Sequence, residues 1–410
     1  MVGSRRPHTK SRKGCRECKR RKVKCDEIQP SCFNCTRYGV TCHYGPDTPK
    51  PDEVWDPSAD STTSTVTAGS PAVEGNPACH SSAKSFSLNR PDSLHLGHAW
   101  GRDLELMHHY CTATSDTMAT QEAARHVWRV LFPQEGYANE YVMHGVLSLA
   151  ALHKAFLIPD RRDIYLTRSA FHHSMGQQHF TTLLSDVNVA NWRSVFCFAT
   201  MVIAYVLSMS MQPDDESEVK TTAILRTLEL ISVTKGVKAI LLPFIPQLNK
   251  TNLAPLVTSV WLTPVDPLPD PKPSLEYSLI PSDVYNALSR LRRFLTEHVS
   301  LKYKGDYEKA VTILEVSAVQ IAYADVNVEV GAILLWPFFL PEIVVSDIKD
   351  HKPQALLILA YYAVFVNALD RVYWFLRGWG RKLLKDINDQ IEAQEPCRDL
   401  LDWPHRHICE

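Results

Sequence analysis

The chain has 410 residues, of which 45% are hydrophobic and 22% charged, values that suit two or three folded domains and exclude wholesale disorder, collagen and a disulfide-stapled scaffold. The net charge of −1 conceals a separation, because residues 1–45 carry twelve Lys and Arg against three acids, whereas residues 46–410 carry 32 basic and 42 acidic residues. A head of charge +9 on a body of charge −10 is typical of a protein that binds nucleic acid.

Residues 1–13 are basic, and we expect them to form a disordered arm. No apolar stretch follows the charges, so the segment does not fit a secretory signal. Without entry into an oxidising compartment, a dense group of cysteines is expected to bind metal rather than to form disulfides. The basic run at residues 5–24 fits a nuclear import signal or a set of DNA phosphate contacts, and both interpretations predict that the chain is nuclear.

Residues 14–43 hold six of the eleven cysteines, in the spacing C-x2-C-x6-C repeated twice: Cys15, Cys18, Cys25, Cys32, Cys35 and Cys42. A structural zinc ion takes four tetrahedral ligands, so six thiolates can serve two ions if two sulfurs bridge. The repeat favours equivalent bridges, Cys15 and Cys32, which lead the two halves. The alternative is one zinc ion on the two C-x2-C pairs, which would leave Cys25 and Cys42 without a role.

The two halves of the cysteine segment differ in charge. Between Cys35 and Cys42 only Arg37 is basic, whereas five of the six residues between Cys18 and Cys25 are: Lys19, Arg20, Arg21, Lys22 and Lys24. Lys and Arg neutralise phosphates and can donate hydrogen bonds to guanine O6 and N7 in the major groove. We therefore expect the first half to face nucleic acid.

The segment from Cys15 to Cys42, with Pro30 in its connecting loop, resembles the fungal binuclear zinc-cluster (Zn2Cys6) DNA-binding domain. The resemblance implies a small domain in which two short helices surround two Zn2+ ions, with the first and fourth cysteines as bridges. It implies that Lys22, with Arg21, reads a CGG-type triplet, while the DNA-binding residues Lys19, Arg20 and Lys24 contact phosphate. The alternative that Lys22 also contacts only phosphate stays open.

Residues 44–98 are rich in Pro, Ser and Thr and poor in large aliphatic residues, which predicts a flexible linker. They show no sustained heptad repeat, so we expect no coiled coil after the cluster. Binding of one DNA half-site by a monomer and homodimerisation through the following domain therefore both stay open.

Residues 99–410 are expected to form a large all-α regulatory domain. In the run from Asp283 to Val299, apolar residues recur at spacings of three and four, which predicts an amphipathic helix after the proline-rich loop at 264–281. Residues 194–213 and 354–369 carry no charge and are largely apolar, and we interpret them as core helices rather than membrane spans.

No catalytic signature occurs in the sequence, which predicts that the chain is not an enzyme. The adjacent histidines at 108–109 and at 172–173 point in different directions on a helix, so neither pair can chelate a metal from one helix face. His405, His407 and Cys409 could gather a metal ion if the C-terminal residues form an extended tail. The acidic run at 214–218 fits a solvated loop or part of an activating surface.

Four segments of the body, at residues 104–110, 144–153, 353–364 and 374–379, are similar to the regulatory domain of the sterol uptake control protein group. This resemblance implies a helical domain that can dimerise and that binds a sterol in some members. Aromatic residues near the end could line such a pocket or simply pack in the core: Trp336, Phe338, Phe339, Trp374, Phe375 and Trp379.

These features predict a nuclear, sequence-specific regulator of RNA polymerase II genes that binds double-stranded DNA at CGG-type sites. Its targets would be a fungal metabolic or secondary-metabolite gene cluster. The alternatives are a sterol-responsive regulator of lipid genes, a zinc-dependent protein-interaction module, and an enzyme with an appended zinc cluster.

Overall fold

The computed structural model describes residues 14–21, 23, 25–28, 32, 34–35, 40–44, 93–209, 222–258, 268–391 and 395–409. The chain divides into two units, Met1–Phe86 and Ser87–Glu410, which we call the head and the body. Several predictions lie outside the described residues: those on the arm at 1–13, Lys22, Lys24, Arg37, the acidic run at 214–218 and nearly all of the linker at 44–98.

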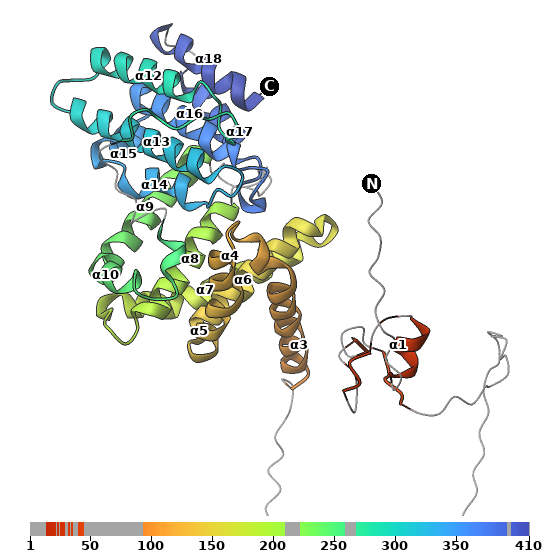
Figure 1. The fold of residues 1–410 in the computed structure, drawn as a ribbon. Helices are drawn as coiled ribbons and strands as arrows, with labels where there is room; N and C mark the ends of the chain where they lie inside the picture. Colours follow the sequence, from red (N-terminus) through yellow and green to blue (C-terminus); the bar gives the residue numbers. More distant parts are fainter. Residues whose placement is uncertain are drawn as a thin grey trace, which may run out of the picture. The chain divides into compact units, whose positions relative to one another are not determined.

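The head contains one complete described helix, α1 (Arg16–Arg20) (Figure 1). Cys15 precedes the helix in an extended conformation, and its Sγ accepts a hydrogen bond from the backbone N–H of Cys18 at 3.5 Å, so a cysteine performs the capping role that Ser or Asp usually has. Asn34 and Cys35 are also helical. Cysteines therefore take part in the helical segments of the head, as the cap of α1 at Cys15 and as a helical residue at Cys35.

The body is helical, and none of its described residues forms a strand, which confirms the predicted all-α class. Helix α3 begins at Ser93, six residues before the expected start of the domain. The first helices are α3 (Ser93–His109), α4 (Glu122–His126), α5 (Phe132–Ala138), α6 (Glu140–Leu157), α7 (Arg162–Leu183), α8 (Trp192–Met209), α9 (Ala223–Leu241) and α10 (Ile245–Leu248). They are followed by α12 (Val284–His298), α13 (Lys304–Ala324), α14 (Gly331–Phe339), α15 (Glu342–Lys349), α16 (Pro353–Ala368), α17 (Trp379–Ile391) and α18 (Glu395–Cys409).

Helices α6 and α7 form a hairpin that packs against α8 in the first half of the body (Figure 1). Small residues make this close approach possible. A Cβ atom built on Gly176 of α7 would lie 2.5 Å from the ring of Phe198 on α8, and one on Gly145 of α6 would lie 2.5 Å from the Met201 side chain. Packing therefore disfavours a side chain at Gly176, where the neighbour is a buried ring, more than at Gly145, where the neighbour is the flexible end of Met201.

Helix α16 is the centre of the second half, where α12, α13, α14, α15, α17 and α18 contact it. Its residues from Ala355 to Val366 are buried, which explains why the segment is apolar on every side. Helix α9 connects the halves, because it packs against α8 on one side and against α14, α15 and α17 on the other (Figure 1).

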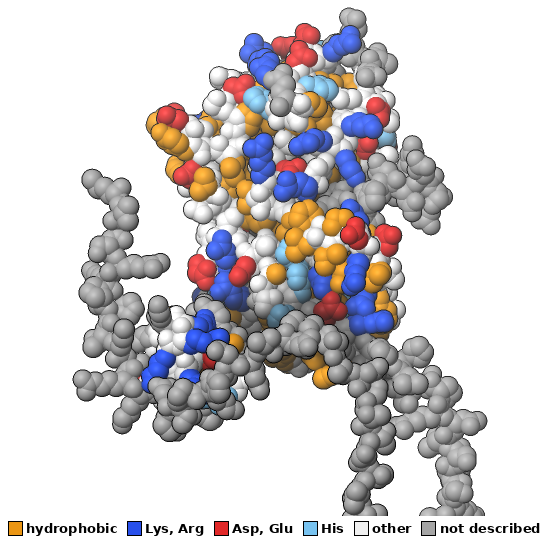
Figure 2. Space-filling view, turned by 90° about the vertical axis from the view of Figure 1, so that its right-hand side faces the viewer, with side chains coloured by type: hydrophobic (Ala, Val, Ile, Leu, Met, Phe, Trp, Pro, Cys, Tyr) orange, Lys and Arg blue, Asp and Glu red, His pale blue; other side chains and the backbone are white. Residues whose placement is uncertain are grey.

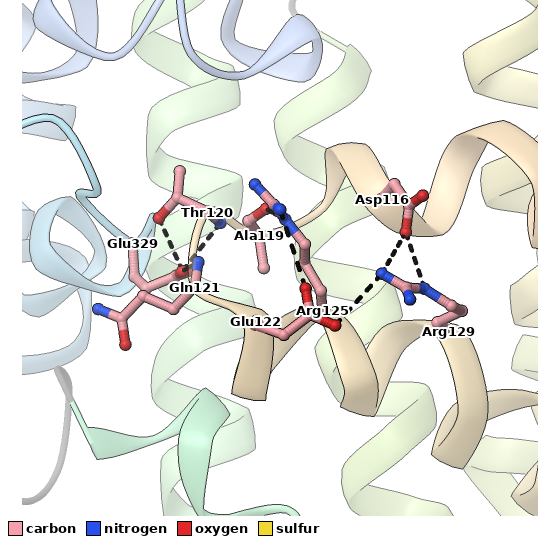
Figure 3. A network of polar contacts seen from close by, with 8 residues as sticks. All are labelled: Asp116, Ala119, Thr120, Gln121, Glu122, Arg125, Arg129 and Glu329. Carbon is pink, nitrogen blue, oxygen red and sulfur yellow. Dashed lines mark hydrogen bonds and ion pairs between the residues drawn. The ribbon is translucent and has the colours of Figure 1, made fainter. Parts of the chain in front are cut away.

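A carboxylate joins two distant segments beside this junction (Figure 3). Glu329, just before α14, accepts hydrogen bonds from the backbone N–H of Thr120 at 2.9 Å and of Gln121 at 2.6 Å, and from the Thr120 hydroxyl at 2.8 Å. Thr120 and Gln121 immediately precede α4, so one side chain fixes the start of that helix to the beginning of α14. We call this contact the Glu329 clamp.

The amphipathic helix predicted after residue 283 is α12, with Val284, Leu288, Leu291 and Leu295 buried. Residues 268–281 of the predicted proline-rich loop form no helix, and residues 264–267 lie outside the described residues. The prediction of an extended tail at the C-terminus was wrong, because residues 395–409 form helix α18. There His407 Nε2 lies 3.2 Å from Asp283, and His405 Nε2 lies 3.0 Å from the Asn388 side-chain oxygen.

Among the described residues, α8 is long and apolar enough to cross a membrane, and the bent pair of α14 and α15 passes the same test together. In α8, however, 72% of the apolar window is buried against other helices of the body. The burial of α8 and α16 agrees with the interpretation of these segments as core helices, while residues 210–213 lie outside the described residues.

Candidate zinc centre and DNA-contacting surface

The cysteine sulfurs of the head meet at its centre. The Sγ atom of Cys15 lies 3.6 Å from that of Cys32 and 3.5 Å from that of Cys35, and Cys18 Sγ lies 3.6 Å from Cys32 Sγ. Two ligands of one tetrahedral zinc ion, each about 2.3 Å from the metal, are separated by roughly 3.8 Å. The observed separations therefore suit shared coordination of metal.

The sequence repeat is reproduced in the backbone around the sulfurs. The N–H of Cys15 donates to Cys25 Sγ at 3.4 Å, and the N–H of Cys32 donates to Cys42 Sγ at 3.3 Å. Likewise, the cap of Cys18 N–H on Cys15 Sγ has its counterpart in Cys35 N–H on Cys32 Sγ at 3.4 Å. Equivalent positions of the two C-x2-C-x6-C segments thus make equivalent contacts.

This geometry bears on the choice between one zinc ion and two. Cys15, Cys18, Cys32 and Cys35 lie close enough together to hold one ion, as the single-site alternative requires. Cys25 and Cys42 are not left aside, however, since each accepts a backbone hydrogen bond from a leading cysteine of a half. Their position beside the cluster favours six ligands over four.

The head has almost no core apart from its sulfurs. Cys15, Cys18, Cys25, Cys32 and Cys35 are its buried hydrophobic residues in the described part, and only Val40, Cys42 and Tyr44 pack against them. So small an apolar core cannot offset the entropy of folding, which is why domains of this size usually depend on metal or disulfides. The residues present therefore fit a structural metal centre.

The pKa values of the thiols differ within the cluster. Burial raises the pKa of Cys15, Cys18 and Cys35, so these groups would remain neutral thiols without a cation. Burial also opposes ionisation of Cys25, but hydrogen bonds from Tyr44 and from the N–H groups of Cys15 and Glu27 outweigh it and lower its pKa to about 7. Zinc would supply the positive charge that makes the buried sulfurs thiolates.

The basic residues of the first half lie at the surface where they are described. Lys19 and Arg20 are exposed on α1, and Arg21 at its end is partly exposed. Arg20 is held by Glu17 through Nη2 at 2.7 Å and Nε at 3.1 Å. This two-pronged pair fixes the guanidinium before any phosphate is present, a feature that the basic spacing alone did not reveal.

The structure also brings together two histidines that the sequence left apart. His144 of α6 and His172 of α7 face each other with their Nδ1 atoms 3.0 Å apart. Burial lowers the pKa of His144 and lowers that of His172 to about 4, so both rings are neutral near pH 7 and share one proton in a hydrogen bond. Asp103 lies 3.4 Å from His172 Nε2. The two rings form a partly buried polar contact between α6 and α7.

Of the six aromatic residues predicted to line a pocket or to pack in the core, Phe338 and Phe375 line an apolar cavity of the body. Trp336 stacks on Tyr362 and donates to the Ala310 carbonyl, and Trp374 stacks on His153 and donates to Thr117. Trp379 is buried in the core, and Phe339 lies under the Lys238 ammonium, 4.0 Å from its ring centre. Most of the set therefore packs in the core.

Comparison with known proteins matches two segments of the chain to fungal domains. Residues 13–51 match the fungal Zn(2)-Cys(6) binuclear cluster domain. Residues 105–212, which run from α3 past the end of α8, match the fungal specific transcription factor domain. The first match covers all six cysteines and the basic residues between them.

Proteins similar to this chain are transcription factors or transcriptional regulators by name. A Zn(2)-C6 fungal-type transcription factor of Gibberella zeae is 24% identical over 98% of this chain and 86% of its own length. The factor afumD of Aspergillus fumigatus, of the same type, is 27% identical over 51% of this chain and 50% of its own length. Sterol uptake control protein 2 of Candida albicans is 55% identical over 43 residues, 10% of this chain and 6% of that protein. Its similarity lies in the zinc-cluster region, not in the body.

Proposed function

We propose that the chain holds two zinc ions and reads CGG-type DNA sites in the nucleus. The proposal starts from its two matches, to the fungal Zn(2)-Cys(6) binuclear cluster domain and to the fungal specific transcription factor domain. With these matches and its similarity to transcription factors, the chain is a DNA-binding transcription regulator. The observation that carries the zinc part is the repeated hydrogen bonding of the two cysteine segments. Cys15, Cys18, Cys25 and Cys32 would hold one ion, and Cys15, Cys32, Cys35 and Cys42 would hold the other.

The DNA part rests on the charge of the first half. Lys19, Arg20 and Arg21 lie at or after the end of α1, and Lys22 and Lys24 follow directly in the sequence. Residues 1–45 carry a net charge of +9, and six thiolates with two zinc ions would contribute −2, so this segment would retain a charge near +7. Lys22 and Arg21 would read the bases, and Lys19, Arg20 and Lys24 would neutralise phosphates.

The regulated genes are those of a fungal metabolic or secondary-metabolite cluster transcribed by RNA polymerase II. The matches to transcription factors do not favour an enzyme with an appended zinc cluster or a zinc-dependent protein-interaction module. The head would bind DNA, and the helical body would regulate transcription of the bound genes.

Fluorescence anisotropy with a CGG-containing duplex tests the proposal against these two alternatives. We expect nanomolar binding by the zinc-loaded chain, with log affinity falling about 0.9 per log unit of salt for each phosphate neutralised. Chelation of zinc should abolish binding and unfold the head, while the thermal transition of the body is retained. An affinity for the duplex that changes neither with salt concentration nor on removal of zinc would contradict DNA recognition by the head.

An apolar cavity in the body supports a second, dependent proposal, that a small apolar molecule binds there. The cavity has a volume of about 80 Å3, and among its walls are Met118, Phe196, Leu334 and Phe375. Its polar groups are few, and Glu329, which also makes the Glu329 clamp, is one of them. A ligand with one hydrogen-bond donor would suit such walls.

A thermal-shift panel of sterols and other apolar metabolites tests the ligand proposal. We expect a compound that fits to raise the melting temperature of the wild-type chain and to do so less in Leu334→Trp, which fills the cavity. No stabilisation by any member of a broad panel would contradict ligand binding and leave the DNA-binding proposal unaffected.

A further inference from the structure

A basic cleft of about 530 Å3 lies between α3 and the beginning of α7. It shares no lining residue with the apolar cavity of the body. Three of its seven lining residues are arginines and one is acidic, although residues 46–410 carry a net charge of −10. The lining residues are Arg102 and Glu105 on the α3 side, and Arg161, Ile164, Tyr165, Thr167 and Arg168 on the α7 side.

The acidic residue of the cleft is already engaged by neighbouring groups. Lys154 of α6 pairs with Glu105 Oε1, and the Tyr165 hydroxyl donates to the same oxygen at 3.2 Å. The hydrogen bond from Lys154 lowers the pKa of Glu105 against the effect of burial, and the charge of Arg168 also lowers it. Glu105 is therefore ionised at neutral pH and is balanced by Lys154, so the positive charge of the three arginines remains.

The three guanidinium groups have no anionic partner of their own. Within the described part of the chain, Arg102, Arg161 and Arg168 form no ion pair and no side-chain hydrogen bond. Asp160 and Asp163, the acids nearest to Arg161 in the sequence, do not line the cleft. Figure 2 shows one side of the body, where Lys and Arg side chains gather in groups among hydrophobic ones. Three unpaired arginines around one cleft indicate a binding site for an anion.

The number of arginines and the size of the cleft indicate the class of anion. A phosphate monoester carries a charge near −2 and three acceptor oxygens, whereas a carboxylate carries one charge and two oxygens. A diphosphate therefore supplies enough oxygens for three guanidinium groups within a small space. The cleft volume lies within the roughly 300–1,000 Å3 of small-molecule sites. Ile164, which is 55% exposed, offers an apolar surface to the organic part of such a ligand.

We propose that this cleft binds a small organic diphosphate, whose phosphates are held by Arg102, Arg161 and Arg168. The site goes beyond DNA recognition by the head, and it differs in place and in chemistry from the apolar cavity. Arg102 and Arg161 are exposed, whereas Arg168 is partly buried, so its charge is less screened by water and contributes most. Because two of the three contacts are exposed, the Kd is on the order of 100 µM.

Isothermal titration calorimetry of the full-length, zinc-loaded chain tests the proposal. The chain is first saturated with a CGG-containing duplex, so that the basic residues of the head are occupied by DNA. The probes are inorganic pyrophosphate and ADP, and adenosine is the control without phosphate. We expect both phosphate probes to bind, with an affinity that falls as salt is raised, and adenosine not to bind.

Variants assign the binding to the cleft. Arg168→Gln keeps most of the aliphatic stem and removes the charge, and it should weaken ADP binding about tenfold. The double variant Arg102→Gln/Arg161→Gln changes only exposed side chains and should weaken binding at least as much. The matched control is Arg293→Gln on α12, which removes an exposed charge outside the cleft and should leave the Kd within about twofold of wild type.

Three results would overturn the proposal: no binding of either phosphate probe, equal binding of ADP and adenosine, or equal ADP affinity in the cleft variants and Arg293→Gln. Displacement of ADP by an excess of unrelated duplex would also overturn it, because nucleic acid would then be the occupant of the cleft. The anisotropy of the labelled CGG duplex is followed in the same samples. Failure of that duplex to bind would contradict the proposed function, whereas the comparison of cleft variants with Arg293→Gln would still decide on the cleft.

Discussion

The Sγ atoms of Cys15 and Cys32, seventeen residues apart in the chain, lie 3.6 Å from each other at the centre of the head. Each leads one copy of the repeated cysteine segment, and each accepts a backbone hydrogen bond from the cysteine three residues later. Their equivalence supports the proposal that these two cysteines are shared by two zinc ions.

The pair of Arg20 and Glu17 should restrain binding to DNA. Glu17→Ala releases the guanidinium and removes a negative charge, so affinity for any duplex should rise about two- to fivefold at low salt. Asp26→Ala removes an equal charge from the head without touching Arg20 and should produce a smaller gain. Equal effects of the two variants in an anisotropy titration would show that Arg20 is not held back by its partner.

Gly176 should be indispensable for the packing of α7 on α8. An alanine Cβ there would lie 2.5 Å from the Phe198 ring, so Gly176→Ala should lower the free energy of unfolding by about 1–3 kcal/mol. Gly236→Ala, in α9, has nothing within 4 Å of the new methyl group and should be neutral or stabilising by up to about 1 kcal/mol. Urea titrations that give the same result for both would contradict the tight packing.

The Glu329 clamp should stabilise the body more than an exposed ion pair does. Glu329→Ala leaves the N–H groups of Thr120 and Gln121 without their acceptor, and we expect a loss of about 1–3 kcal/mol. Glu342→Ala removes the carboxylate that pairs with Lys235 on the surface, where the expected cost is below about 1 kcal/mol. Chemical denaturation measures both, and a Glu329→Ala variant no less stable than Glu342→Ala would argue against the clamp.

Buried histidines should make the body less stable in acid. Burial lowers the pKa of His153, His172 and His173 to about 4 each, below the 6.5 of the unfolded chain. Between pH 6.5 and 4 the unfolded state thus binds more protons, and stability should decline as pH falls through this window. His173→Phe, which retains the stacking on Tyr205, should lessen the decline by about 1–3 kcal/mol, whereas the exposed His108→Phe should leave it unchanged. Tryptophan fluorescence in urea at several pH values measures the difference.

What could be predicted from the sequence depended on short-range spacing. The cysteine repeat and the apolar period of α12 both operate within a few residues, and both reappear in the structure. Contacts between distant segments left no such pattern. Glu329 and Thr120 are 209 residues apart, and His144 meets His172 only because of the register between α6 and α7.

The aromatic residues near the C-terminus illustrate the same limit. Their composition is compatible with a pocket or with a core, and only the packing of the helices separates Phe338 and Phe375, which line the cavity, from Trp336 and Trp379, which do not. Residues 405–409 were misplaced for a related reason, because α18 is helical where it packs on α16 and α17 and its own sequence contains a proline.

The most direct test of the account is the affinity ratio between a CGG-containing duplex and a scrambled one, measured by anisotropy on wild type, Lys22→Ala and Lys24→Ala. Wild type should prefer the CGG duplex by at least tenfold. Lys22→Ala should bring the ratio close to one, since the base-reading side chain is lost, whereas Lys24→Ala should weaken both complexes equally and preserve the ratio. A wild-type ratio of one, or a Lys22→Ala variant that keeps the full preference, would contradict base recognition by this head.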